Sequence, residues 1–247
     1  MFQRTILYHG EELAIQNKKV STRSRVLLVI LTVIVLIAAV AALAYWRYVY
    51  PTGEIMPGVY AIRTHNNSMP MGNLFLLQLG DSGSYIAIDT GGDTSETENG
   101  MQKLGISAND VIAVFITHSH WDHIGALEPF DNAIIYTGNT ENSAFPDIPH
   151  HMMEDGEIKV FSNLSVQCVY TPGHTIDHVC YLVDGNMLFA GDLFITTNDS
   201  PFEQRYDKEL QIEFREIVLG FDDVKYVFTG HFGLFKNTGF YQWWFLR

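Results

Sequence analysis

The chain of 247 residues carries 28 acidic and 15 basic side chains, for a formal net charge of −13. This length supports one large hydrophobic core. Residues 1–50 hold six Lys/Arg and two Asp/Glu, so residues 51–247 hold nine (15 − 6) and twenty-six (28 − 2), a formal charge of −17. A surface of that sign repels phosphate backbones, which argues against nucleic acid as a partner.

The first predicted element is an uncharged, apolar run of twenty-one residues, Val26–Trp46, between Arg25 and Arg47. At about 1.5 Å rise per residue, such a helix is about 31 Å long, which is enough to cross the hydrocarbon core of a membrane. A cleavable signal peptide is the competing interpretation, because Ala42-Leu43-Ala44 resembles a cleavage site. The twenty-five leading residues and the length of the run favour an uncleaved anchor.

The flanking cations predict the orientation of this helix. Four precede it closely, whereas Arg47 and Arg63 are the first two that follow. The positive-inside rule then places the N-terminus in the cytoplasm and the rest of the chain outside it, in a single-pass protein of the cell membrane. The predicted organisation is a cytoplasmic segment (1–25), a transmembrane helix (26–46), a linker (47–57) and one folded domain (58–247).

Beyond the linker, apolar runs bounded by turn residues predict ten strands and four helices. The strands are predicted at Val59–Arg63, Asn73–Leu79, Tyr85–Asp89, Val111–Thr117, Ala133–Thr137, Ile158–Phe161, Leu164–Tyr170, His178–Val183, Met187–Ala190 and Lys225–Thr229. The helices are predicted at Thr94–Leu104, around Ile124–Glu128, around Asn139–Ser143 and at Asp207–Val218. Strands that alternate with helices indicate a layered α/β domain.

The most informative motif is the run from His118 to His123, which reads His-Ser-His-Trp-Asp-His and directly follows the predicted strand Val111–Thr117. Three imidazoles and a carboxylate within six residues make a poor surface loop. Imidazole nitrogen and carboxylate oxygen are ligands that suit zinc, iron or manganese. The motif therefore predicts a metal site at the end of this strand.

Three further strands each end in a glycine or polar break that carries His or Asp. They place His174 in Thr-Pro-Gly-His-Thr, Asp192 in Ala-Gly-Asp and His231 in Thr-Gly-His. Rigid strands position such loops, and the glycines allow close backbone approach. Each residue alone could be an ordinary turn residue, but the set is hard to explain as structure and indicates one metal centre.

Together, THSHWDH, TPGHT, AGD and TGH resemble the metallo-β-lactamase superfamily over about Gly58 to Lys236, most closely its glyoxalase-II-like (hydroxyacylglutathione hydrolase-like) branch. The resemblance implies a four-layer αββα sandwich with the metals at one sheet edge. It also implies that Asp89 holds the metal ligands in position without binding a metal itself. The implied ligands are His118, His120 and His174 for one metal and Asp122, His123 and His231 for a second, with Asp192 bridging.

The resemblance further implies a hydrolase that binds two divalent ions, with zinc expected, and the predicted transmembrane helix anchors it to the membrane. The ions would share a water and present hydroxide to a small-molecule ester, thioester, lactone or lactam, and Asp122 would orient that hydroxide as a catalytic group. Two departures separate the chain from named activities. Only sixteen residues follow His231, whereas hydroxyacylglutathione hydrolases carry a helical glutathione-binding region there, and the commonest penicillin-degrading enzymes have Cys where Asp192 stands.

Two alternatives remain open. His118, His174 and Asp192 alone would form a 2-His-1-carboxylate iron triad, as in the persulfide dioxygenases of the same superfamily. The second alternative is a membrane-tethered binding module that has the same fold but catalyses no reaction.

Cysteine and histidine residues outside the predicted ligand set have no assigned role. Cys168 and Cys180 lie on the strands either side of the His174 turn, where they could be cross-strand neighbours that form a disulfide, or two buried thiols. His178, at the start of a predicted strand, is expected to be a packed histidine rather than a support of the metal site.

Overall fold

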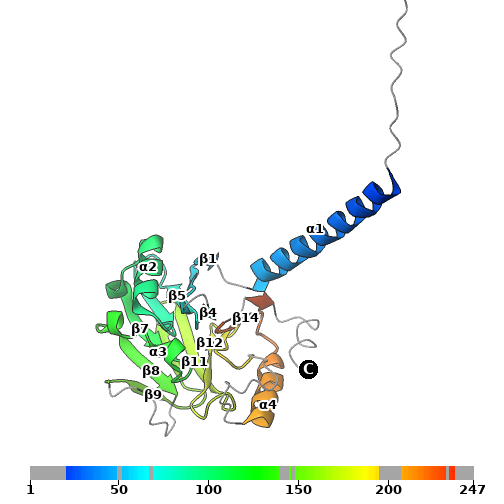
Figure 1. Cartoon of the computed structure of the whole chain (residues 1–247). Coiled ribbons are helices and arrows are strands. Elements are labelled where there is room, and N and C mark those ends of the chain that lie inside the picture. The colour runs from blue at the N-terminus through cyan, green and yellow to red at the C-terminus, as the bar shows by residue number, and fades with distance from the viewer. Residues whose placement is uncertain are drawn as a thin grey trace, which may run out of the picture. The chain divides into compact units, whose positions relative to one another are not determined.

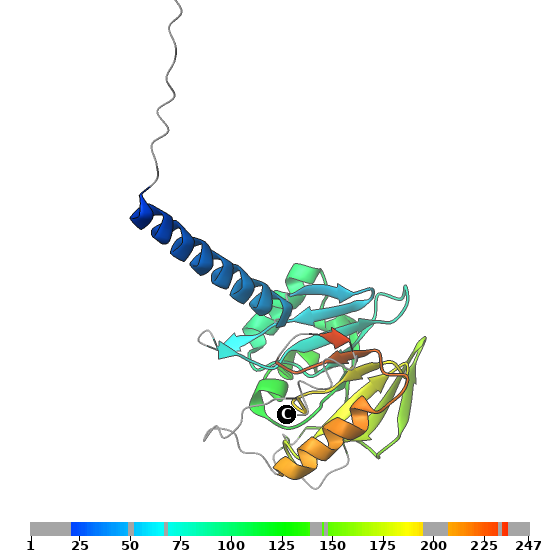
Figure 2. The ribbon, with the colours of Figure 1, turned by 90° about the vertical axis from the view of Figure 1, so that its right-hand side faces the viewer.

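The computed structural model describes residues 21–48, 52–66, 69–138, 145, 148–194, 207–231 and 234–236. The chain divides into two compact units, Met1–Ala44 and Tyr45–Arg247. Figures 1 and 2 show the chain in two views at right angles.

The long helix α1 (Thr22–Tyr48) begins after Ser21, whose side chain accepts a hydrogen bond from the backbone N–H of Ser24 at 3.1 Å. Its window Thr22–Val40 has a mean hydropathy of 2.4, and its large apolar side chains are exposed. By length and composition this helix can cross a membrane, properties that a signal sequence shares. It contains the predicted run Val26–Trp46 and extends it at both ends.

The second unit contains two large sheets, with a short hairpin formed by β3 (His65–Asn66) and β4 (Met69–Pro70). The first sheet has the strand order β1-β2-β5-β6-β7-β8-β9, and the second runs from β10 to β15 in sequence order. The first comprises β1 (Gly53–Met56), β2 (Val59–Ile62), β5 (Leu74–Gln78), β6 (Tyr85–Ile88), β7 (Val111–Phe115), β8 (Ile134–Gly138) and β9 (His151–Met153). The second comprises β10 (Ile158–Phe161), β11 (Leu164–Tyr170), β12 (Val179–Val183), β13 (Met187–Phe189), β14 (Tyr226–Phe228) and β15 (Phe235–Lys236).

The sheets stack face to face, and helices cover their outer faces (Figure 1). Alternate residues of β5 show why: Phe75 and Leu77 pack in the core between the sheets, whereas Leu74 and Leu76 pack in a core that includes Met101 of α2 (Thr94–Leu104). On the other side, a third core joins the outer face of the second sheet to α4 (Lys208–Leu219). The layers are therefore αββα, which confirms the predicted fold class.

Helix caps explain where these two helices begin and end. The Asp93 carboxylate accepts from the N–H of Glu96 at 2.9 Å, and Asp207 does the same for Leu210 at 2.9 Å. Helix α2 ends at Gly105, which has φ +70°, a left-handed conformation that glycine adopts without strain. The bounds predicted for α2 are confirmed, and α4 begins one residue later than predicted.

Other predicted elements differ from the structure. The helix predicted around Ile124–Glu128 is wrong in position, because α3 covers Trp121–Ile124 and the next turn is the 3₁₀ helix Glu128–Phe130. The strand β1 lies inside the predicted linker 47–57. Sequence analysis also missed the short strands β3, β4, β9 and β15. The helix predicted around Asn139–Ser143 lies outside the described residues.

The two cysteines are not cross-strand neighbours. Cys168 pairs with Tyr181 and Cys180 with Val169, so the two thiols lie on opposite faces of the second sheet. Cys168 packs between the sheets, and Cys180 packs on the α4 side. Both are buried and free, so the disulfide alternative is wrong.

The two ends of the sandwich differ. One end carries the loops that follow β6, β7, β11, β13 and β14, where all the predicted metal ligands lie. The opposite end carries tight turns within antiparallel pairs, such as residues 184–186 between β12 and β13.

Candidate metal centre

The structure brings all seven predicted metal ligands together at one end of the sheets. Backbone bonds join the sheets there: the N–H of Asn73 donates to the carbonyl of Gly230 at 2.8 Å, and that of Val179 to the carbonyl of Thr117 at 2.8 Å. The side chains fall into two groups, each with its possible ligand atoms within 4.8 Å of one another. The first group is His118, His120, His174 and Asp192, and the second is Asp122, His123 and His231.

The first group points three imidazole nitrogens at one place. The Nδ1 atom of His120 lies 3.0 Å from Nε2 of His118 and 3.0 Å from Nε2 of His174. The Oδ2 atom of Asp192 lies 3.3 Å from Nε2 of His174 and 3.7 Å from Nε2 of His118. Three nitrogens and one oxygen at these separations can surround a single ion.

The second group shares Asp192 with the first. Nε2 of His231 lies 3.2 Å from Oδ2 of Asp122 and 3.3 Å from Oδ2 of Asp192. Nε2 of His123 lies 3.3 Å from the other oxygen of Asp192, Oδ1. The Asp192 carboxylate therefore stands between the two groups, which is the position that a bridging ligand requires.

Glycines allow the second group to approach so closely. A Cβ atom on Gly230 would lie 2.5 Å from Oδ1 of Asp192 and 2.9 Å from Cε1 of His123. A Cβ on Gly72 would lie 2.5 Å from the carbonyl of Asp122. At both positions any larger residue would have to displace the ligands.

Asp89 orients His123 directly. The Nδ1–H of His123 donates to Oδ2 of Asp89 at 2.7 Å, which turns the Nε2 side of the ring toward Asp192. Asp89 is buried and has φ +55°, a left-handed conformation that Asp tolerates better than most side chains. That conformation lies directly after β6, at the point where the carboxylate turns toward the ligands.

Asp89 also orients His118, through Thr117. The Thr117 hydroxyl donates to Oδ2 of Asp89 at 2.9 Å, and the Thr117 N–H donates to Oδ1 at 2.8 Å. The hydroxyl oxygen then accepts from Nδ1 of His118 at 3.0 Å, which leaves Nε2 of His118 with its lone pair toward the other ligands. One carboxylate thus fixes the ring orientation of a histidine in each group.

Side chains of the turn after His174 accept hydrogen bonds from backbone N–H groups of, or next to, other candidate ligands. Nε2 of His178 accepts from the N–H of Asp192 at 3.1 Å, and its Nδ1 contacts the Thr171 hydroxyl at 2.9 Å. Oδ2 of Asp177 accepts from the N–H of Ser119, between His118 and His120, at 2.9 Å. Sequence analysis treated His178 as packed and gave Asp177 no role. Their partners lie 14 and 58 residues away, so no local pattern signals them.

Protonation differs between the two groups. Burial holds the pKa of His118 well below its ordinary value and also lowers the pKa of His120. Burial also lowers the pKa of His231, but the Asp192 and Asp122 carboxylates outweigh it and raise that pKa to about 9. For His123 too, the Asp192 and Asp89 carboxylates outweigh burial and raise the pKa. The lowered pKa values favour neutral rings at His118 and His120, whereas the raised pKa values favour protonated rings at His123 and His231.

The residues fit a divalent metal. Nε2 of His123 and Oδ1 of Asp192 are buried and form no hydrogen bond within the described part of the chain. Such atoms are costly in a folded protein unless they have a partner, and an ion coordinated by both supplies one. Nitrogen and carboxylate donors suit zinc, iron and manganese.

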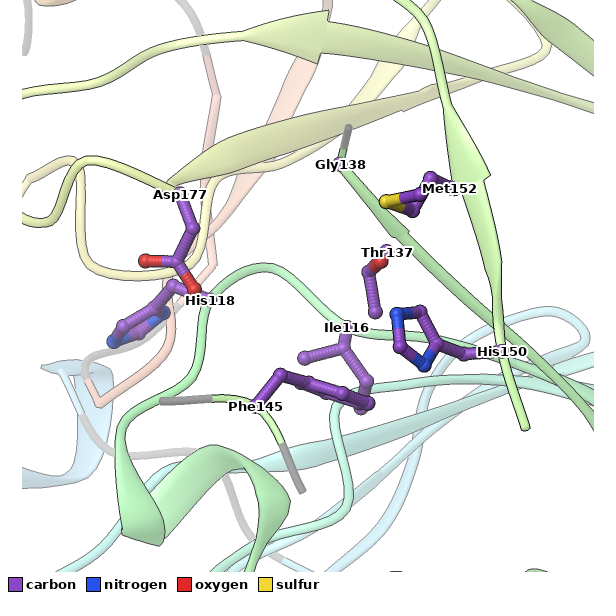
Figure 3. A pocket seen from close by; sticks show the side chains of 8 residues that line it. All are labelled: Ile116, His118, Thr137, Gly138, Phe145, His150, Met152 and Asp177. Atoms are coloured by element: carbon purple, nitrogen blue, oxygen red, sulfur yellow. The ribbon is translucent and has the colours of Figure 1, made fainter. Parts of the chain in front are cut away.

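A small cavity lies beside His118, on the side of the ends of β7 and β8 (Figure 3). Its volume is about 30 Å³, and its lining includes His118, Asp177, Phe145 and His150. Figure 3 shows Asp177 next to His118 and the other two side chains across from them. Among the described residues, this volume is enough to hold a water molecule.

The chain belongs to the metallo-β-lactamase superfamily, whose sequence pattern matches residues 70–231. It is 28% identical over 133 residues to a hydroxyacylglutathione hydrolase of Acaryochloris marina, covering 47% of this chain and 51% of that protein. It is 29% identical over 118 residues to BaeB of Bacillus velezensis, named a probable polyketide biosynthesis zinc-dependent hydrolase, covering 46% and 51%. These relatives support the glyoxalase-II-like branch, and the matches span about half of each relative's length.

A solved structure has the same fold. A metallo-β-lactamase family protein from Thermus thermophilus superimposes with a TM-score of 0.60 at 20% identity, covering 74% of this chain and 76% of that one. The likeness agrees with the αββα layers described above.

Proposed function

We propose that the chain is a membrane-anchored, dinuclear metal-dependent hydrolase of an ester, thioester, lactone or lactam. The observation that carries this proposal is the arrangement of seven nitrogen and oxygen ligands in two groups around the shared Asp192 carboxylate. A single ion needs only the first group. The second group adds three more residues, of which His123 faces Oδ1 of Asp192 and His231 faces Oδ2, and this arrangement supports a second ion.

Each residue has a distinct role in this proposal. His118, His120 and His174 would hold one ion, Asp122, His123 and His231 would hold the other, and Asp192 would serve both. When bound, two divalent ions supply Lewis acidity and a water of lowered pKa. Asp122 is part-exposed, and its carboxylate is available to orient the attacking water. Asp89 holds His118 and His123 in the orientation that binding requires.

Zinc is the proposed metal. Nitrogen-rich donor sets suit zinc, and the relative from Bacillus velezensis carries a zinc-dependent name. The hydroxyacylglutathione hydrolase relative makes a thioester the first substrate to try.

The test is elemental analysis of the full chain, purified in detergent without chelator, followed by assays on ester, thioester, lactone and lactam substrates. We expect two zinc ions per chain and hydrolysis of at least one class. A single iron with oxygen uptake on a persulfide would replace the hydrolase with the dioxygenase. A chain that binds no metal and hydrolyses nothing would point to the binding module.

The proposal includes topology: the segment 1–25 is cytoplasmic, α1 remains as a single span, and the metal centre lies outside the cytoplasm. Support comes from four cations before the uncharged run and one close after it. Protease added to spheroplasts should reach the domain that follows the span. A protected domain would reverse the orientation, and a mature N-terminus at Tyr45 would mean a cleaved signal.

A further inference from the structure

The chain enters the second unit at the end of the first sheet that carries the metal ligands. Gly53, the first residue of β1, pairs with Ala61 near the end of β2. The antiparallel pairs β2–β5 and β5–β6 bring that end of β2 level with the end of β6, which Asp89 follows. The register of these three strand pairs therefore places Gly53, the entry point of the chain into the first sheet, at the same end of that sheet as the candidate ligands.

The entry point is also close to the ligands across the sheet. In the order β1-β2-β5-β6-β7, β1 stands four positions from β7, the strand that precedes His118. At about 4.8 Å between neighbouring strands, this amounts to about 19 Å. A hydrogen bond fixes the entry, because the side-chain oxygen of Thr52 accepts from the N–H of Arg63 at 3.2 Å.

The connection from α1 to this point is short. Helix α1 ends at Tyr48 and β1 begins at Gly53, which leaves four residues between them. Even fully extended, a connection of this length spans less than about 20 Å. With α1 as the proposed membrane span, a connection this short keeps the first residue of β1 within about 20 Å of the end of that span.

Two exposed apolar side chains lie on the ligand-bearing loops. Trp121, between His120 and Asp122, is 57% exposed, and Ile176, two residues after His174, is 45% exposed. Single exposed apolar residues are common, so these two support the inference but do not carry it. Their place beside polar ligands suits a substrate with an apolar part next to its carbonyl group.

We propose that the substrate is a carboxylic ester or thioester with a long acyl chain that resides in the membrane to which the enzyme is anchored. This inference rests on the proposed function and names its substrate class. In the reaction, the oxygen of water bonds to the acyl carbon and the C–O or C–S bond breaks. A carboxylic acid and an alcohol or thiol are released, and nothing is oxidised or reduced.

The test measures kcat/KM for four substrates with the full chain reconstituted in phosphatidylcholine vesicles. Two are the palmitoyl and acetyl thioesters of one small thiol, and two are the matched palmitoyl and acetyl esters. We expect kcat/KM for the vesicle-borne palmitoyl substrate to exceed that for the acetyl substrate by about tenfold or more. Equal values, or a preference for the acetyl substrate, would overturn the inference while leaving the hydrolase standing. Hydrolysis of none of the four would count against the proposed function itself.

A tether variant tests the geometry separately. Insertion of twenty Gly/Ser residues between Tyr50 and Pro51 lengthens the connection about sixfold, which should lower the local concentration of the site at the membrane by roughly 15-fold. We expect the palmitoyl preference to fall by about tenfold and acetyl hydrolysis to be unchanged. An unchanged preference would overturn the role of the tether.

Side-chain variants provide a matched pair. Trp121→Ser should lower the ratio of palmitoyl to acetyl hydrolysis, whereas Val160→Ser, which changes a residue that is 71% exposed on β10, should leave the ratio at the wild-type value. Equal effects of the two substitutions would contradict a role for Trp121 in contact with the acyl chain.

Discussion

The two ligand groups are built from the same kinds of side chain but differ in how the protein holds them. The first is more enclosed: His118, His174 and Asp192 are buried and His120 is part-exposed, and two backbone N–H groups beside them donate to side chains of the turn after His174. The second is more open, since Asp122 and His231 are part-exposed and His123 is buried. We therefore expect the first group to be the more shielded ion site and a substrate to approach from the side of the second.

Removal of the shared ligand should have the largest effect. Asp192→Ala takes a carboxylate from both groups, so we expect both ions to be lost and hydrolysis to fall to background. The loss should exceed the roughly 10–100-fold effect typical of residues that only support a ligand. Metal content and turnover are the measurements, and wild-type values for both would show that the groups do not share this residue.

Substitution of His178 tests the enclosed group. His178→Leu leaves the buried N–H of Asp192 without its acceptor, so metal affinity should fall by about 10–100-fold. His178→Gln places an amide oxygen where it can accept from that N–H and should restore most of the affinity. Absorption spectra of the cobalt-substituted variants would report the change in coordination. Identical affinities for the Leu and Gln variants would mean that His178 only fills space.

Gly230→Ala tests the open group. The added Cβ meets Asp192 and His123, so we expect weaker binding of the second ion, by about 10-fold or more, with less effect on the first. Gly53→Ala is the matched control, because a Cβ there meets no atom within 4 Å. Calorimetric titration with zinc separates the two affinities. Equal weakening of both sites would indicate general distortion of the ligands.

Proton release on metal binding should distinguish the groups further. Raised pKa values leave His123 and His231 protonated at neutral pH, and coordination requires the neutral ring, so binding should release about two protons from the second group. Because the pKa of His231 is about 9, this release should stay nearly constant from about pH 6.5 to 7.5. Calorimetry in buffers of different ionisation enthalpy measures it. A steep fall over that range would indicate ordinary histidines with a pKa of about 6.5.

The cysteines should show the smallest effect. Burial raises the pKa of Cys168 and of Cys180 to about 12, so at about pH 8 neither folded thiol should react with iodoacetamide. Activity should be unchanged after this treatment, and both thiols should be modified in denaturant. Recovery of a disulfide between them would contradict their placement on opposite faces.

The sequence predicts the metal centre further than it predicts the details of the fold. The candidate ligands could be predicted because each follows a strand in a short motif, and the structure brings those strand ends together. The roles of Asp177 and His178 could not, since their hydrogen bonds join segments that only the folded chain brings together. The sequence left open whether the cysteines are cross-strand neighbours or two buried thiols, because a one-residue difference in register decides which face a side chain occupies; the structure confirms two buried thiols. Strand β1 was missed because most of its stability comes from pairing with β2 rather than from its four residues.

The tight turns at the end of the sandwich away from the ligands offer a practical handle. In the turn after β12, Asp184 and Gly185 are exposed, and Gly185 has φ +67°, a conformation that favours glycine. Exposed turn tips of this kind tolerate insertions. An epitope inserted after Gly185, with the glycine kept, would therefore let the protein be tracked in cells, or fixed to a sensor surface, at the end of the sandwich away from the candidate metal centre.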